Sequence, residues 1–239
     1  MALRTDQGIV LRGYPFGESD RVVVLLSPNH GKLRTVAKGV RKTKSRFGGR
    51  LEPMTHVDIV LYEGRNLDTI TQVSVINGFP NVRNDLDRVL AAGTMIEVVD
   101  AVVQEDDPSH RMFLLLQRGL TVLDHQQPHP DLVTAFLIKA AEIVGVEPAF
   151  GSCSGCGTTE GLSRFNFAAG GSVCEQCKTP GSYALRPGVV EYLARVKASD
   201  MSQLPDADPS MSNEALGITK RFIEYHLERR IETLAVPNA

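Results

Sequence analysis

The sequence predicts an α+β chain of several domains: a small five-stranded β-barrel, then an all-helical domain with an inserted four-cysteine zinc finger. Three observations lead to this prediction. Short β-rich runs fill about the first seventy residues, helical spacing of apolar residues begins after Pro80, and all four cysteines lie in one 25-residue segment. We place the barrel at 1–80 and the helical domain at 81–239, with the zinc module at 150–180.

The barrel prediction rests on five β-rich runs separated by turn residues. These runs are Gly8 to Arg12, Arg21 to Leu26, Lys32 to Val40, His56 to Tyr62 and Asp68 to Ile76. The fourth run alternates between apolar and polar residues, as expected of a strand with one buried face. In the third run the alternation slips, so that Val36 follows Leu33 on the buried face. Five short strands in this length of chain suit a small barrel.

Three helix starts follow the barrel. Asn84 is expected to cap the first helix, Asp107 and Pro108 to begin the second, and Pro130 and Asp131 to begin the third. The carboxylates of Glu105 to Asp107 also suggest a cation site, but the proline directly after them favours a helix cap.

Two further helices are predicted near the end of the chain. A short helix lies near Gly188 to Lys197, and a long amphipathic helix begins at Ser212 with an apolar stripe that reaches Leu234. Because the long helices are apolar over wide arcs, we expect them to pack into one bundle.

The cysteines form two Cys-x-x-Cys pairs, and this spacing is the strongest signal in the chain. The pairs are Cys153 with Cys156 and Cys174 with Cys177, and seventeen residues separate them. Each pair can direct two thiolates at one ion from a tight turn, so the two pairs together complete a tetrahedron. Four thiolates leave no open position for water or substrate. We therefore predict one structural Zn²⁺ per chain.

Three other uses of the four cysteines are open. Two disulfides would need an oxidising compartment, and residues 1–7 contain no apolar stretch that would direct secretion. A thioredoxin-like pair would need one Cys-x-x-Cys beside a βαβ pattern. Four thiolates can also hold an iron–sulfur cluster. Between the pairs, Phe165 and Phe167 are predicted to lie in a hairpin and to cover the metal.

A basic segment, residues 21–51, contains nine basic residues and no acidic one, which leaves a charge of −11 on the rest of a chain whose net charge is −2. The nine are Arg21, Lys32, Arg34, Lys38, Arg41, Lys42, Lys44, Arg46 and Arg50. Such an asymmetry suggests a polyanion that binds at one defined place. A solvated basic loop would explain the same charges.

Recognisable catalytic motifs are missing. The sequence contains no phosphate-binding loop, dinucleotide fingerprint, zinc-protease helix or nucleophile elbow, so nucleotide hydrolysis and dinucleotide chemistry are not expected. His125 and His129 are four residues apart, but the proline between them favours a loop over a ligand pair.

A small barrel with a basic connection is a common way to hold single-stranded nucleic acid, because a charged groove follows the phosphates while aromatic rings stack on bases. The aromatic candidates are few: Tyr14, Phe16, Phe47 and Tyr62. We therefore expect affinity to come mainly from Lys and Arg contacts to phosphate, so that binding tolerates sequence and weakens with salt.

Several short stretches together match the pattern of one known family. In the barrel they are Tyr14 to Asp20 (YPFGESD), Gly31 to Leu33 (GKL), Val36 to Gly39 (VAKG), Ser45 and Leu51 to Pro53 (LEP). In the cysteine module they are Cys156–Gly157, Phe165, Gly170–Gly171 and Cys174. With these stretches the chain resembles the bacterial RecO family of recombination mediators, and the resemblance covers most of the chain. It lies in the ordered combination of barrel, basic loop, helices and cysteine module.

The resemblance implies an OB-fold domain joined to a helical domain with an inserted zinc finger, and a mediator that is neither nuclease nor motor. Members of this family bind single- and double-stranded DNA and anneal complementary strands. With RecR they help to load RecA onto strands covered by single-stranded DNA-binding protein (SSB), whose C-terminal tail they bind through the helical domain. For DNA contact the resemblance points to Lys38, Arg41, Lys42, Lys44 and Arg46.

Two other functions stay open at this point. One is a zinc-containing enzyme with the helical bundle as its substrate pocket, and the other is a zinc-ribbon module that binds RNA. No run approaches the roughly 18 apolar residues of a membrane span. We therefore expect a cytoplasmic protein with no membrane partner, and the family resemblance implies that it joins the nucleoid during repair.

Overall fold

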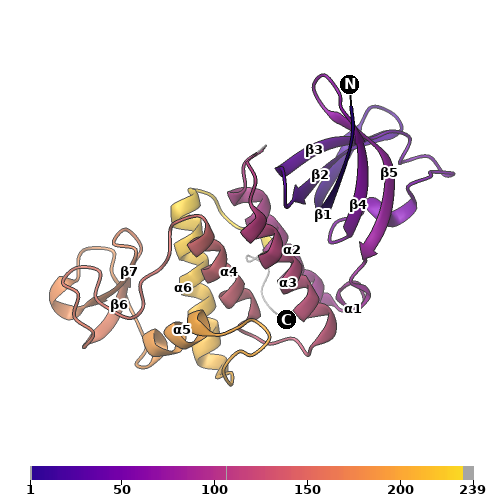
Figure 1. Ribbon diagram of the computed structural model, residues 1–239. Helices are drawn as coiled ribbons and strands as arrows, with labels where there is room; N and C mark the ends of the chain where they lie inside the picture. Colours follow the sequence, from indigo (N-terminus) through magenta and orange to yellow (C-terminus); the bar gives the residue numbers. More distant parts are fainter. Residues whose placement is uncertain (1, 106, 234–239) are drawn as a thin grey trace. The chain divides into compact units, whose positions relative to one another are not determined.

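The computed structural model describes residues 2–105 and 107–233. They form two compact units, Met1–His125 and Gln126–Ala239. The first unit contains a five-stranded sheet and three α-helices, and the second contains three further α-helices and a small sheet (Figure 1). The sequence analysis expected one bundle of helices, whereas the described helices divide between these two units.

The sheet of the first unit has the five predicted strands. Its strands are β1 (Leu3–Phe16), β2 (Asp20–Ser27), β3 (Gly31–Ala37), β4 (His56–Tyr62) and β5 (Asp68–Asn77). They follow the order β1-β2-β3-β5-β4, and β4 pairs with β1. The seam between β3 and β5 is parallel and consists of two residue pairs, Thr35 with Asp68 and Val36 with Thr69. This order and short seam give the partly open barrel of an OB-fold, as predicted.

Alternating residues of these strands fill the interior of the barrel. The buried apolar residues there are Val10, Val23, Leu25, Leu33, Ala37, Phe47, Leu51, Val57, Ile59, Leu61 and Ile70. The predicted slip in β3 is wrong, because β2 and β3 pair without a register shift and Val36 lies outside this cluster. Thr35 takes the buried position, and its Oγ1 donates to the carbonyl oxygen of Val23 (3.0 Å).

Three helices complete the first unit: α1 (Pro80–Arg83), α2 (Leu86–Val102) and α3 (His110–His125). The cap of α2 is Asp85, not Asn84 as predicted, and its side chain accepts from the N–H of Arg88 (3.0 Å). Helix α3 begins at His110, so Asp107 and Pro108 precede it. Asp106, part of the predicted acidic run, lies outside the described residues.

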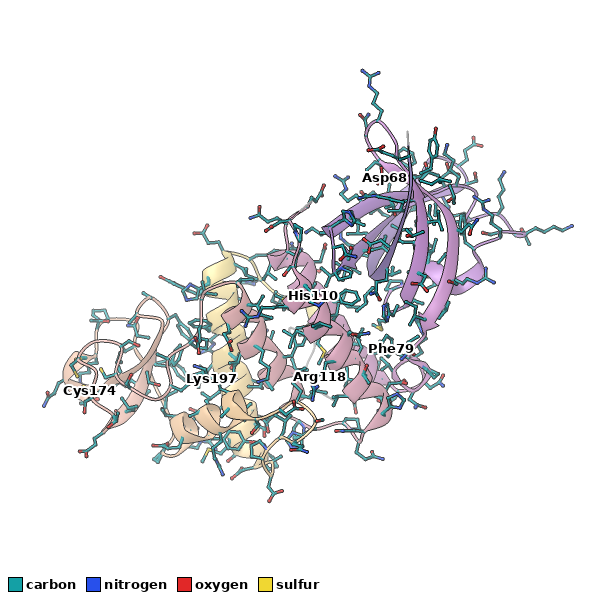
Figure 2. The ribbon with its side chains drawn as sticks, viewed as in Figure 1. Asp68, Phe79, His110, Arg118, Cys174 and Lys197 are labelled. Carbon is teal, nitrogen blue, oxygen red and sulfur yellow. The ribbon has the colours of Figure 1, made fainter. Side chains whose placement is uncertain are left out.

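Ion pairs and backbone contacts join the barrel to these helices. Arg12 pairs with Asp100 of α2 (2.6 Å), and Nζ of Lys32 donates to the Asp100 carbonyl oxygen (2.6 Å). Phe79, at the passage from β5 to α1, is fully buried and adopts a left-handed conformation (φ 47°). Both Phe79 and Asp68, the first residue of β5, are labelled in Figure 2.

The second unit contains α4 (Leu132–Ile143), β6 (Leu162–Asn166), β7 (Gly171–Cys174), β8 (Tyr183–Ala184), α5 (Val189–Ala198) and α6 (Pro209–Leu227). Its strands follow the order β7-β6-β8. Helix α6 begins three residues before the predicted Ser212, because Asp208 caps it by accepting from the N–H groups of Ser210 and Met211. The helix ends at Leu227, and Leu234, the predicted end of its stripe, lies outside the described residues.

A buried carboxylate joins the three helices of the second unit. Asp131 precedes α4, as predicted, but its side chain makes no capping bond. It accepts instead from the hydroxyl of Tyr192 on α5 (2.5 Å) and of Ser212 on α6 (2.9 Å). At the end of α5, Lys197 (Figure 2) pairs with Glu147 (2.5 Å), just before the cysteine module. Among the described residues, no helix is long and apolar enough to cross a membrane.

Candidate nucleic-acid interface and metal centre

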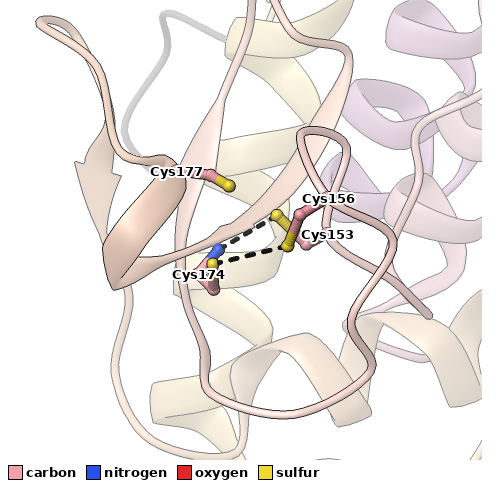
Figure 3. Close-up of side chains that lie close together, drawn as sticks. All are labelled: Cys153, Cys156, Cys174 and Cys177. Carbon is pink, nitrogen blue, oxygen red and sulfur yellow. Dashed lines mark hydrogen bonds between the residues drawn. The ribbon is translucent and has the colours of Figure 1, made fainter.

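The four cysteines lie together at one end of the small sheet (Figure 3). Their sulfur atoms are all within 4.8 Å of one another, and those of Cys156 and Cys174 are 3.9 Å apart. A tetrahedral zinc with Zn–S bonds of about 2.3 Å separates its sulfurs by roughly 3.8 Å. The four thiols therefore fit such an ion, and they are the one group of this kind within the described residues.

Backbone N–H groups support a thiolate in this centre. The N–H groups of Cys174 and Gly155 each lie 3.4 Å from Sγ of Cys153. These bonds, with the N–H of Cys174 contributing most, lower the pKa of Cys153 to about 6. Hydrogen bonds with the other three sulfurs, first that of Cys156, raise the pKa of Cys177 to about 12. A cation is needed to hold all four sulfurs as thiolates.

Glycine is required inside the first cysteine turn. A Cβ on Gly155 would lie 2.9 Å from Cβ and 3.0 Å from Sγ of Cys177. Gly157 adopts a left-handed conformation (φ 78°) directly after Cys156. Both glycines therefore permit the tight turns around the first cysteine pair.

The aromatic residues of the hairpin do not cover the metal centre, contrary to the prediction. The apolar cluster around the cysteines is formed by Val173 and Leu162. Phe165 is fully buried, and its ring lies 5.9 Å from that of Phe222 on α6 and 5.3 Å from that of Phe167. These rings attach the cysteine module to α6.

The basic segment spans β2, β3 and the loop that leads to β4. Six of its nine basic side chains lie in that loop and are exposed: Lys38, Arg41, Lys42, Lys44, Arg46 and Arg50. We call these six the loop cations. The other three pair with carboxylates: Arg21 with Glu52 (2.9 Å), Lys32 with Asp100 (3.5 Å) and Arg34 with Glu105 (3.5 Å).

The backbone of this loop is held at both ends. At its start, the N–H of Gly39 donates to Oδ1 of Asp20 (2.7 Å) and the N–H of Arg41 to the carbonyl oxygen of Ser19 (3.0 Å). The Gly39 bond is the main cause of the lowered pKa of Asp20. At its far end, Phe47 and Leu51 insert into the apolar interior of the barrel. The loop cations are therefore displayed on an anchored backbone.

The four aromatic candidates of the barrel differ in accessibility. Phe47 is buried in the core, so it cannot stack on a base in this conformation. Phe16 is 49% exposed and lies opposite Asp20 at the end of the β1–β2 ladder, beside the residue that holds the loop. Tyr14 accepts a hydrogen bond from Arg34 (2.9 Å), and Tyr62 is exposed on β4. Phe16 is the aromatic side chain best placed to work with the loop cations.

Comparison with known proteins agrees with this architecture. The model of the Recombination protein O N terminal family matches residues 1–79, and the model of the Recombination protein O C terminal family matches residues 83–235. The DNA repair protein RecO of Nocardioides sp. is 41% identical over 239 residues, covering 98% of both chains. The DNA repair proteins RecO of Frankia casuarinae and Thermobifida fusca are each 38% identical over 237 residues, with the same coverage. This chain therefore belongs to the RecO family of recombination proteins.

Proposed function

We propose that this chain is a non-catalytic mediator of DNA repair and homologous recombination that binds single- and double-stranded DNA and anneals complementary strands. The observation that carries the proposal is the group of six loop cations on an anchored loop of the OB-fold barrel. Phosphate contacts of this kind supply affinity without reading sequence. The family membership supports the same role in DNA repair.

Annealing follows from charge neutralisation. Two complementary strands repel each other through their phosphates, and Lys and Arg contacts replace condensed counterions around each strand. An exposed ring such as that of Phe16 can stack on a base that is not yet paired. Neither step requires nucleotide hydrolysis.

The partners that we propose are RecR, RecA and SSB. The chain, with RecR, would assist the loading of RecA onto single strands that SSB covers. Binding of the acidic, apolar C-terminal tail of SSB would raise the local concentration of the chain at covered DNA, so that the loop cations compete for phosphates. This work would take place in the cytoplasm, at the nucleoid.

The cysteine centre would hold one structural Zn²⁺ through Cys153, Cys156, Cys174 and Cys177. When bound, the ion supplies folding free energy to its own segment and offers no open coordination position. We keep the division into an OB-fold at 1–80 and a helical domain at 81–239, with the zinc module at 150–180, as part of this proposal.

The experiment that tests the function is fluorescence-monitored annealing of complementary oligonucleotides, without nucleotide, across a salt series and with or without SSB. We expect annealing that persists on SSB-covered strands and that weakens steeply as salt is raised. A chain with no DNA affinity at low salt would contradict the proposal. A marked preference for RNA in direct competition would instead favour a zinc-ribbon module that binds RNA.

A matched pair of variants locates the interface. Charge reversal of three loop cations, Arg41→Glu, Lys42→Glu and Lys44→Glu, should abolish annealing and leave thermal stability unchanged, because these side chains are exposed. The control is Arg21→Gln with Arg34→Gln, which removes two basic residues of the same segment that are already paired with carboxylates. Equal losses in both variants would mean that the loop cations are not the binding surface.

A further inference from the structure

A groove lies between the edge strand β8 and helix α6 in the second unit. It has a volume of about 810 Å³. Residues of the chain from Tyr183 to Arg186 form one wall, and residues of α6 from Ser210 to Arg221 form the other. We call it the α6 groove. Its size is within the range of sites for small molecules or single nucleotides.

The polar groups of the groove favour an anion. The guanidinium of Arg221 lies over the ring of Tyr183, 5.1 Å from its centroid. Arg186 pairs with Glu214 (3.2 Å), and the same carboxylate accepts from the backbone N–H of Arg186 (3.0 Å). Glu214 is thereby neutralised, whereas Arg221 brings a positive charge to the groove and pairs with no carboxylate of the residues that the structure describes.

An exposed tyrosine accompanies this arginine. Tyr183 is 41% exposed, and it lines the groove together with Arg221. Tyr225 lies one turn further along α6 but is not part of the groove lining, and its ring lies 6.4 Å from that of Phe167. An exposed aromatic ring beside an arginine is an arrangement that stacks on unpaired bases and contacts phosphate, with little dependence on sequence.

We propose that the α6 groove is a second site for single-stranded nucleic acid, in which a base stacks on Tyr183 while Arg221 contacts phosphate. The proposal rests on the proposed function in one respect, that DNA is the ligand. It adds a site on a different unit from the loop cations. Two DNA-binding sites on one chain would favour annealing, because each site can hold one of the two strands.

The main competing ligand is a peptide that would add a strand to the sheet beside β8. This edge of the sheet is poorly suited to such a peptide. Strand β8 is two residues long, and the N–H of Arg186, two residues beyond its end, already donates to Glu214. Affinity in strand addition comes from a series of main-chain hydrogen bonds. The groove offers too short a ladder for this, whereas its aromatic ring and guanidinium groups suit bases and phosphates.

The test uses the full-length, zinc-loaded chain and the variants Tyr183→Ala, Tyr183→Phe and Arg221→Gln. Fluorescence anisotropy with a labelled oligothymidylate should show that Tyr183→Ala and Arg221→Gln each bind about tenfold more weakly, because a stacked base or a phosphate contact is lost. Tyr183→Phe keeps the ring and should bind like the parent chain. Affinity for a duplex of the same length should change little, since its bases are already stacked.

Photocrosslinking gives an independent readout. Oligonucleotides with 5-iododeoxyuridine should crosslink to Tyr183 in the parent chain, as identified by mass spectrometry. Crosslinks confined to the first unit, together with unchanged anisotropy in the variants, would overturn the α6 groove while leaving the proposed function standing. Loss of binding to a labelled acidic peptide, with oligothymidylate binding intact, would overturn it in favour of a peptide site. A parent chain that binds no DNA would instead reject the proposed function itself.

Discussion

The OB-fold barrel and the cysteine module are both small β structures, but they are stabilised in different ways. Eleven buried apolar residues fill the barrel, whereas the cluster around the cysteines contains three buried residues, two of them cysteines. Burial of one large apolar side chain contributes about 1.5–3 kcal/mol. The barrel can therefore fold on its apolar core and tolerate a loop dense in positive charge, while the proposed zinc ion would supply most of the stability of the cysteine module.

Removal of one metal ligand should have the largest effect. Cys174→Ser should abolish stoichiometric zinc binding and unfold the module, because structural zinc contributes on the order of 10 kcal/mol to such segments. Zinc content and limited proteolysis of residues 150–180 measure this. Glu160→Ala, an exposed change in the same module, should leave both unchanged. If the module of the zinc-free variant resisted proteolysis, its fold would not depend on zinc, and the proposed difference from the barrel would be wrong.

The converse change in the barrel is Phe47→Ala. Phe47 is buried in the core and anchors the basic loop, so its truncation should lower the free energy of unfolding by about 3–5 kcal/mol. Urea denaturation measures the loss, and zinc content should stay at one ion per chain. The control is Phe16→Ala, an exposed phenylalanine of the same barrel, which should change stability by about 0.5 kcal/mol or less. Similar losses in the two variants would refute the anchoring role.

Neutralisation of loop cations should change the salt dependence of DNA binding more than it changes the free energy of unfolding. Each phosphate contact contributes about 0.7 to the slope of log affinity against log salt on single strands. The variant Arg41→Gln, Lys42→Gln, Lys44→Gln should therefore reduce this slope by about 2, as measured by anisotropy in a salt series. Arg21→Gln alone should leave the slope nearly unchanged, since Glu52 already pairs with that guanidinium. An unaltered slope in the triple variant would show that these side chains do not contact phosphate.

The smallest expected effect is a change in the free energy of unfolding of the barrel with pH. Burial lowers the pKa of His56 below its usual 6.5, while Asp58 acts weakly in the opposite direction. Below pH 6.5 the unfolded chain binds a proton that the folded chain does not, so stability falls as pH decreases, by at most about 1.4 kcal/mol per pH unit. Urea midpoints between pH 7.5 and 5.5 should show this loss. His56→Gln should flatten the dependence, whereas His125→Gln, an exposed histidine, should not.

Local sequence signals were reliable wherever one element contained the whole pattern. The five strands, the starts of α2 and α4 and the two cysteine pairs were all visible because alternation, helix-start signals and Cys-x-x-Cys spacing act over a few residues. Two errors were of the same local kind: one residue at the cap of α2, and three residues at the start of α6. At α2 the neighbours Asn84 and Asp85 are about equally good caps, and at α6 the cap is Asp208, four residues before the predicted Ser212.

Long-range contacts decided the rest. Nothing in the sequence near Lys32 shows that Asp100, 68 residues away, accepts its hydrogen bond, or that Glu105 pairs with Arg34. Phe165 was expected over the metal, but the packing of the small sheet against α6 buries it beside Phe222. The groove between Tyr183 and Arg221 joins residues from a strand and a helix whose proximity no spacing encodes.

The sequence by itself determined the order of the elements, the two cysteine pairs that could hold a metal ion and the density of positive charge, because propensity, spacing and charge are properties of short stretches. Only the tertiary structure decided which cations are free to meet phosphate, which aromatic rings are exposed and where a groove forms. Those properties depend on which distant side chains packing brings together, and a carboxylate neutralises a cation only when the fold places the two within contact distance.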